Sequence, residues 1–110
     1  MPDVPDTPKE IMEAMPSVFN AEKAQGLKAT YQFELVGEGG GTWVVDIADG
    51  KCQVREGAAE SPDVIIGMAV EDYVAMAKGQ LEAVRAFMAG KVKVKGDVNL
   101  AAKVTSLFQI

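Results

Sequence analysis

The side chains that could carry out covalent chemistry are few and lack partners. Three serines, Ser17, Ser61 and Ser106, stand outside any Gly-x-Ser-x-Gly motif, and the chain has no histidine to activate them. The absence of histidine also removes the commonest general base and the commonest metal ligand. The single cysteine, Cys52, lies in an alternating stretch typical of a strand, so we expect a buried thiol rather than a reactive one. The sequence therefore gives no support for nucleophilic catalysis.

Carboxylates are the second possible source of chemistry. Most lie at predicted turns or helix starts, where capping and solvation explain them. They include Asp46, Asp49, Asp63, Glu71, Asp72 and Asp97. Two of them could pair as acid and base, which the sequence alone leaves open. Their spacing matches no calcium loop, so we expect neither a metal nor a cofactor.

Apolar side chains are the remaining functional resource. Five internal methionines, Met12, Met15, Met68, Met76 and Met88, stand on or beside apolar stripes. Methionine is unbranched and polarizable, so such a set fills a core or forms an adaptable lining for ligands of differing shape. The composition leaves both interpretations open.

The overall composition limits the possible partners. A chain of 110 residues with 48% hydrophobic and 25% charged residues is typical of one globular domain. A net charge of −5 without a stripe of Lys and Arg argues against nucleic acid. Only the cluster Lys91, Lys93 and Lys95 offers cations to an anionic membrane, so we expect transient membrane contact at most.

The chain ends and the hydropathy bear on location. No apolar run approaches the roughly 20 residues of a membrane span. The start of the chain is acidic and rich in proline, unlike a signal peptide, and the last residues are not a Ser-Lys-Leu-type peroxisomal address. We therefore expect a cytoplasmic protein with a flexible lead over residues 1–6 and one domain over residues 7–110.

The first half of the chain predicts short helices followed by a meander of strands. Thr7 and Glu10 form a capping box, and Pro16 ends or kinks the helix that follows, with a second short turn through Phe19. Asn20 can cap another short helix over residues 21–25. Alternation then predicts strands over residues 27–36, 42–48 and 51–55. The glycine-rich residues 37–41 predict a hairpin loop, because no Gly-Lys-Ser/Thr follows as in a phosphate loop. Asp49-Gly50 predicts a two-residue hairpin turn.

The second half predicts one inner strand, two helices, an edge strand and a final helix. The strand covers residues 64–68, the helices begin at Val70 and Gln80, and the edge strand covers residues 91–95. The last helix follows Gly96-Asp97. Each strand offers one apolar face, so the helices must gather on one side of the sheet, and the fold class is α+β.

Two stretches together resemble the sterol carrier protein 2 family. Residues 42–51 (TWVVDIADGK) resemble the central hairpin of that family. Residues 76–97 resemble its helix–helix–strand–turn block, and residues 100–107 resemble its terminal helix. No single motif is specific, but their order and spacing agree over about 70 residues from Tyr31 onward.

The resemblance implies a five-stranded, mostly antiparallel sheet with about five helices packed on one face and an apolar tunnel between the layers. It implies non-catalytic binding and intracellular transfer of fatty acids, fatty acyl-CoA or sterols. The alternative is an accessory or interaction domain that presents acyl substrates to a partner enzyme of lipid metabolism. We expect a monomer with a small-molecule lipid ligand.

The tunnel lining is predicted from side chains whose period directs them between the sheet and the helices. These are Ile11, Met15, Phe19, Phe33, Leu35, Trp43, Val45, Met68, Tyr73, Met76, Leu81, Phe87, Met88, Leu100, Val104, Leu107 and Phe108. A carboxylate or CoA head group would need a cation at the tunnel mouth. Lys91, Lys93 and Lys103 are the candidates, with solvated surface lysines as the alternative.

Overall fold

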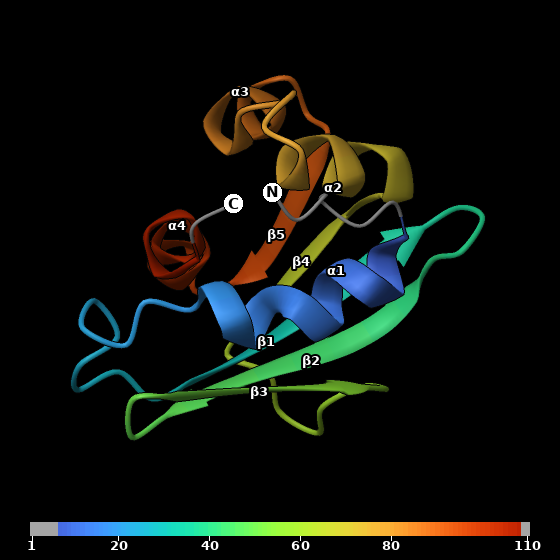
Figure 1. Ribbon diagram of the computed structural model, residues 1–110. Helices are drawn as coiled ribbons and strands as arrows, with labels where there is room; N and C mark the ends of the chain where they lie inside the picture. The colour runs from blue at the N-terminus through green and yellow to red at the C-terminus, as the bar shows by residue number, and fades with distance from the viewer. Residues whose placement is uncertain (1–6, 109–110) are drawn as a thin grey trace.

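Five strands, four α-helices and one 3-10 turn make up residues 7–108, which the computed structural model describes apart from the side chains of residues 83, 105 and 106 (Figure 1). The helical elements are α1 (Pro8–Ala14), η1 (Met15–Val18), α2 (Val70–Ala77), α3 (Ala83–Met88) and α4 (Val98–Leu107). The strands are β1 (Ala29–Val36), β2 (Gly41–Ala48), β3 (Lys51–Glu56), β4 (Val64–Ala69) and β5 (Val92–Gly96). The lead predicted over residues 1–6 lies outside the described residues.

The five strands form one sheet in the order β3-β2-β1-β4-β5. The pairs β1–β2, β2–β3 and β4–β5 are antiparallel, whereas β1 and β4 are parallel, with Tyr31 opposite Val64. The expected mostly antiparallel sheet is confirmed, with a parallel pair at its centre. Asp49 and Gly50 join β2 to β3 with φ of 53° and 72°, the left-handed conformation that a tight two-residue hairpin requires.

The helices lie on one face of the sheet, as predicted (Figure 1). The predicted helix count of about five is corrected to four α-helices and one 3-10 turn in the described residues. Residues 21–26 form successive turns instead of a helix. The Asn20 side chain does accept from Lys23 N at 3.2 Å, but the segment is stopped after one turn by Gly26, whose φ is 78°.

The N-terminal helix begins and ends where the sequence predicts. Thr7 Oγ1 accepts from Glu10 N at 3.3 Å and donates to Glu10 Oε1 at 2.8 Å, and Pro8 occupies the first turn. The α-helix ends at Ala14, and η1 carries Pro16. The tighter 3-10 turn accommodates a proline that has no N–H to give to an α-helical ladder.

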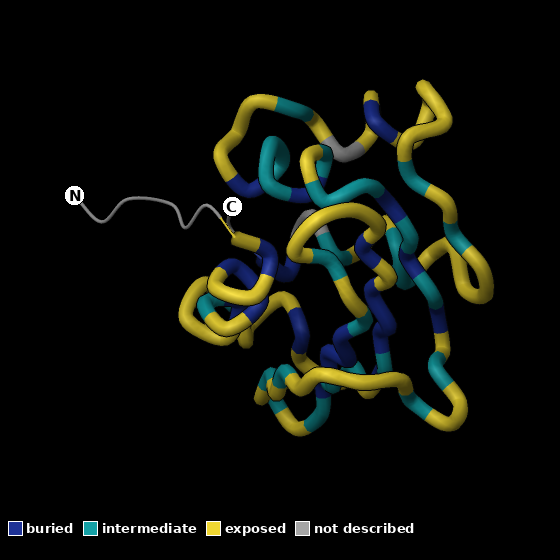
Figure 2. The backbone as a smooth tube through the Cα atoms, turned by 90° about the vertical axis from the view of Figure 1, so that its right-hand side faces the viewer, coloured by how far each residue is buried: buried dark blue, intermediate teal, exposed yellow. Residues whose placement is uncertain are grey.

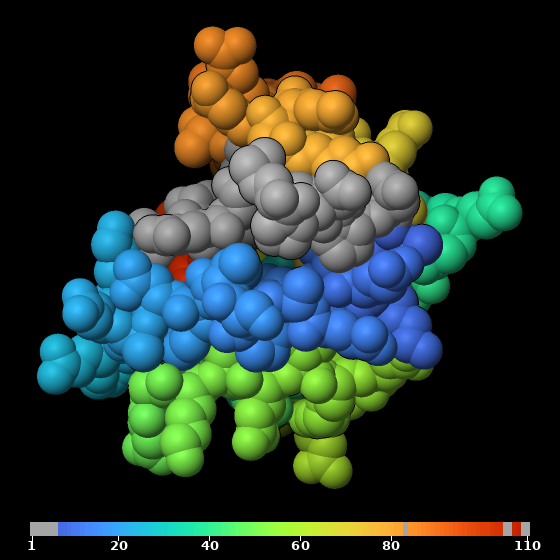
Figure 3. Space-filling view, in the orientation of Figure 1, coloured from blue at the N-terminus to red at the C-terminus, as the bar shows by residue number. Residues whose placement is uncertain are grey.

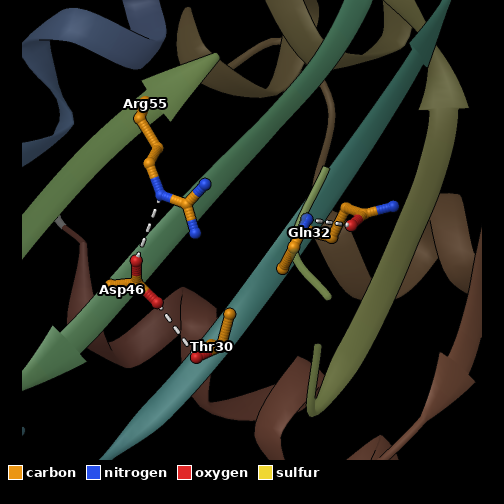
Figure 4. A network of polar contacts seen from close by, with 5 residues as sticks. Thr30, Gln32, Asp46 and Arg55 are labelled. Carbon is orange, nitrogen blue, oxygen red and sulfur yellow. Dashed lines mark hydrogen bonds and ion pairs between the residues drawn. The ribbon is translucent and has the colours of Figure 1, made fainter. Parts of the chain in front are cut away.

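The outer face of the sheet is covered in part by the loop between β3 and β4. Figure 4 shows a polar network there, in which Thr30 Oγ1 donates to Asp46 Oδ1 at 2.9 Å and Arg55 Nε lies 3.6 Å from Asp46 Oδ2. The Gln32 side chain accepts from Ala59 N at 2.9 Å. These contacts explain why Gln32 is buried, and they occupy Asp46 as a structural acceptor.

The start of α4 depends on Asp97. Its side chain accepts hydrogen bonds from Asn99 N at 2.9 Å and Leu100 N at 3.3 Å. We expect Asp97→Ala to lower the free energy of unfolding by about 1 kcal/mol, because these two N–H groups lose their partner. Urea unfolding of the two proteins measures the difference. Asp97→Asn keeps the acceptor oxygen, so it should stay close to wild type; an equal loss in both variants would contradict the capping role.

Candidate ligand-binding site

The candidate site is the layer of side chains between the inner face of the sheet and the helices. Alternate residues of every strand point into it, and α1, η1, α2 and α4 supply the opposite side. Buried segments therefore gather in the middle of the molecule, and exposed segments lie at its turns (Figure 2). Among described residues, the one buried polar side chain outside the aromatic residues is Gln32, which belongs to the outer face.

Most of the predicted lining residues meet in this layer. Ten are buried: Ile11, Met15, Phe33, Leu35, Trp43, Val45, Met68, Tyr73, Leu107 and Phe108. Four are half-buried and pack against them: Phe19, Met76, Leu100 and Val104. Leu81 is half-buried but stands outside the packed cluster. These fourteen clustered residues bring seven of the ten elements into contact with one another across the layer.

Phe87 and Met88 require a correction. The sequence directs both between the layers, but their side chains are 50% and 80% exposed. Helix α3 packs through the small residue Ala86, which is fully buried, and turns its large side chains outward. Spacing identifies an apolar stripe but does not say which side of a one-turn helix faces the core.

Several layer residues are absent from the predicted lining. Met12 and Tyr31 are fully buried, and Ile47, Val64 and Ile66 belong to the same cluster. Strand alternation was the signal that could have found all but Met12, because each shares a face with a predicted lining residue. Met12 follows Ile11 on α1, and both are buried because α1 contacts α2 as well as the core.

The two tyrosines are the polar groups of the layer. Tyr31 Oη donates to the backbone oxygen of Leu100 at 2.8 Å, which ties α4 to β1, and Tyr73 Oη lies 3.4 Å from Met15 Sδ. Burial, with Asp97 and Asp63 nearby, raises the pKa of Tyr31 to about 12. Burial also raises the pKa of Tyr73. Both phenols are therefore neutral at physiological pH, and the layer is apolar.

The segment after η1 and the C-terminal end of α4 meet at the edge of the layer. Phe19 and Phe108 form an isolated antiparallel bridge, and their ring centroids are 5.6 Å apart. Next to them, Asn20 N donates to Leu107 O at 2.7 Å. We call Phe19, Asn20, Leu107 and Phe108 the terminal clasp. It fixes the C-terminal end of α4 to the segment after η1.

The described residues give little support for metal binding, a reactive thiol or a buried head-group cation. Among the described residues, no group of three or more His, Cys, Asp or Glu side chains could hold a metal ion. Burial, with Asp46 beside it, raises the pKa of the half-buried Cys52 thiol to about 11, so the thiol is protonated and unreactive at neutral pH. The candidate head-group lysines, Lys91, Lys93 and Lys103, are all exposed.

Two open grooves lie outside the layer. One, of about 560 Å³, is lined by residues of the 21–28 turns and the β2–β3 hairpin. The other, of about 550 Å³, lies between the end of β1 and α2 and includes Val36, Val70 and Val74. Neither groove contains any of the seventeen predicted lining residues. In this structure the layer side chains pack against one another, so a ligand there must separate them.

The comparisons with known proteins agree with this geometry. The sequence model of the SCP-2 sterol transfer family matches residues 9–109. Hydroxysteroid dehydrogenase-like protein 2 of Rattus norvegicus is 39% identical over 100 residues, which are 90% of this chain and 19% of the relative. The chain thus spans about a fifth of the length of that curated relative. It resembles one segment of a larger protein.

Two solved structures show the same fold. The palmitated SCP2L2 of Aedes aegypti superposes with a TM-score of 0.74 at 27% identity, covering 89% of this chain and 90% of that chain. The inverting sec-alkylsulfatase Pisa1 of Pseudomonas sp. superposes with a TM-score of 0.82 at 19% identity, covering 94% of this chain and 16% of that chain. The second likeness shows the fold alone.

Proposed function

Because the chain belongs to the SCP-2 sterol transfer family, we propose that it is a non-catalytic carrier that binds one lipid between the sheet and the helices. The observation that carries the proposal is the apolar layer, in which both tyrosines are neutral and the described chain contributes no charged side chain. The palmitated relative of Aedes aegypti supports a fatty acid as the first ligand to test. Fatty acyl-CoA and sterols stay predictions from the sequence.

The mechanism follows from how the layer is closed. Its side chains pack against one another, so binding must displace apolar contacts and replace them with contacts to the acyl chain. Met12, Met15 and Met68 suit this exchange, because methionine changes rotamer at low cost and keeps its contacts. We propose that helix α4 is the element that moves. The Tyr31–Leu100 hydrogen bond and the terminal clasp hold it in place, so ligand entry would require these contacts to open.

The energetics allow useful affinity without a specific polar contact. Burying a sixteen-carbon chain at about 0.8 kcal/mol per methylene gives roughly 12 kcal/mol gross. Lost motional freedom of the ligand and the displaced side-chain contacts take back a part of it. A dissociation constant in the micromolar range, about −8 kcal/mol, is within reach. Discrimination between chains differing by one methylene should be weak.

Native mass spectrometry of the purified protein, followed by organic extraction, tests the proposal. We expect a fatty acid or similar lipid at about one per chain, or such a complex after addition of palmitate. A bare protein mass that added palmitate, palmitoyl-CoA and sterol all leave unchanged would mean that the layer is a filled core.

A pair of variants on α4 locates the ligand. Leu100 is half-buried against the layer, whereas Val98 on the same helix is 57% exposed. Leu100→Asp should weaken palmitate binding at least about tenfold, because a carboxylate beside an acyl chain must be desolvated. Val98→Asp introduces the same charge outside the layer and should bind like wild type. Equal loss in both variants would place the ligand elsewhere.

An accessory role is the second candidate, and the curated relatives favour it. The chain covers only about a fifth of the rat relative, so a domain of this kind occurs within a larger protein. In this role the domain presents an acyl substrate to a partner enzyme of lipid metabolism. Transfer of a fluorescent fatty acid between vesicles separates the two: a carrier accelerates it without an enzyme, whereas an accessory domain binds the lipid and leaves the transfer rate unchanged.

Two further expectations complete the proposal. None of the helices in residues 7–108 is long and apolar enough to cross a membrane. The cytoplasmic location and the monomeric state stay predictions from the sequence, and the native mass spectrum measures the second directly.

A further inference from the structure

Helix α3 presents an apolar face to solvent. Val84, Phe87 and Met88 are spaced i, i+3 and i+4, so they share one side of the helix, and they are 65%, 50% and 80% exposed. Ala86, on the opposite side, is fully buried and holds the helix to the protein. The helix projects from the edge of the molecule next to the start of β5 (Figures 1 and 3). We call Val84, Phe87 and Met88 the α3 tip.

Positive charge is concentrated around the α3 tip. Residues 78–95 contain five of the eleven Lys and Arg residues but only one of the sixteen Asp and Glu residues, Glu82. This segment therefore has a net charge of +4, whereas the rest of the chain has −9. Arg85 pairs with Glu82 at 3.6 Å, but both side chains are more than 70% exposed, so the pair is weak. In a protein of net charge −5, the segment that carries the apolar tip is thus cationic.

Lys91, just before β5, and Lys93 and Lys95, on β5, lie at increasing distance from the α3 tip. Lys91 follows the helix directly, since Gly90 N donates to Phe87 O at 3.1 Å and Lys91 N to Ala86 O at 2.9 Å. Lys91, Lys93 and Lys95 are exposed. Along a strand, Lys93 lies about 7 Å and Lys95 about 13 Å from Lys91. Screening at physiological salt acts over about 8 Å, so Lys91 and Lys93 dominate the field at the tip.

We propose that the α3 tip, with Arg85, Lys91 and Lys93, docks the protein onto an anionic lipid bilayer. The inference rests on the proposed carrier function, which needs a surface that meets membranes. A six-residue helix offers far less than the roughly 800 Å² per partner of a stable protein interface. Insertion of three apolar side chains into the headgroup region needs only this tip, and the surrounding cations match the charge of anionic headgroups.

Vesicle co-sedimentation of the full chain tests the docking. We expect binding to phosphatidylcholine vesicles with about one third phosphatidylserine, weaker binding to pure phosphatidylcholine, and a decline as salt rises. The triple variant Val84→Ser, Phe87→Ser, Met88→Ser should bind at least about tenfold more weakly. Lys91→Gln should lose about fivefold. If the true partner is an acidic protein, the wild type will not bind vesicles, and this result overturns the proposal.

Matched controls lie at other exposed sites. Val98→Ser removes an exposed valine at the start of α4, and Lys51→Gln removes a cation from β3 at the opposite edge of the sheet. Both should bind vesicles like wild type; losses equal to those of the tip variants would overturn the docking face. Palmitate binding separates the two proposals. If the wild type binds vesicles through the tip but does not bind palmitate, docking is supported and the carrier function fails. If the wild type binds palmitate but not vesicles, only docking is overturned.

Discussion

Replacing Phe108 with alanine is expected to lower the free energy of unfolding by about 3 kcal/mol, near the lower end for a buried phenylalanine. Phe108 is 2% exposed, stacks at a tilt on Phe19, and closes the terminal clasp over the layer. Its loss leaves a cavity and removes the contact that holds the end of α4. Urea or thermal unfolding measures the change.

The same variant tests whether α4 controls access to the layer. If it does, Phe108→Ala should release bound fatty acid faster, because less free energy is needed to lift the helix end. Stopped-flow transfer of a fluorescent fatty acid to acceptor vesicles gives the rate. A normal release rate in a clearly destabilised Phe108→Ala protein would exclude α4 as the moving element.

Phe87→Ala is the matched control for Phe108→Ala. It removes the same ring from a side chain that is 50% exposed, so the loss of stability should stay below about 1 kcal/mol. A double-mutant cycle with Phe19→Ala isolates the ring pair, for which we expect a coupling of about 1 kcal/mol. No coupling would mean that the bridge backbone, and not the rings, holds the clasp.

Alkaline solution should destabilise the protein strongly. The pKa of Tyr31 is raised from 10.0 to about 12, and that of Tyr73 is raised as well. In the unfolded chain both phenols release their protons near pH 10, whereas the folded chain retains them. The two phenols should therefore cause a loss of stability as pH rises from 10 to 12, by about 2 to 3 kcal/mol for Tyr31 alone and by more with Tyr73. Cys52, whose pKa is raised from 9.0 to about 11, should add a loss that begins near pH 9.

The measurement is denaturant unfolding at a series of pH values. The sequence has only two tyrosines, so phenolate absorbance reports these two groups alone. Tyr31→Phe should lose about 1 kcal/mol at neutral pH, because Leu100 O loses its donor, but should show a shallower alkaline slope. The variant with both tyrosines replaced should have the flattest profile. An unchanged slope in that variant would assign the alkaline transition to other groups.

The order and type of the elements could be read from the sequence because their causes are local. Alternating residues such as Tyr31, Phe33 and Leu35 dictate a strand with one buried face. Asp49-Gly50 adopts the positive φ values that its hairpin demands, and Thr7 and Asp97 cap their helices. Since each strand offers one apolar face, the one-sided packing of the helices followed as well.

The tertiary structure decided what local pattern leaves open. The parallel pairing of β1 with β4 joins strands 28 residues apart in sequence, and no turn between them dictates it. The contact between Phe19 and Phe108 brings together two segments that lie far apart in the sequence. Helix α3 lies with Ala86 against the protein and with Phe87 and Met88 toward solvent, which reverses the orientation expected from the sequence. Spacing along the chain determines which side chains share a face, but only packing between distant segments determines which face is covered.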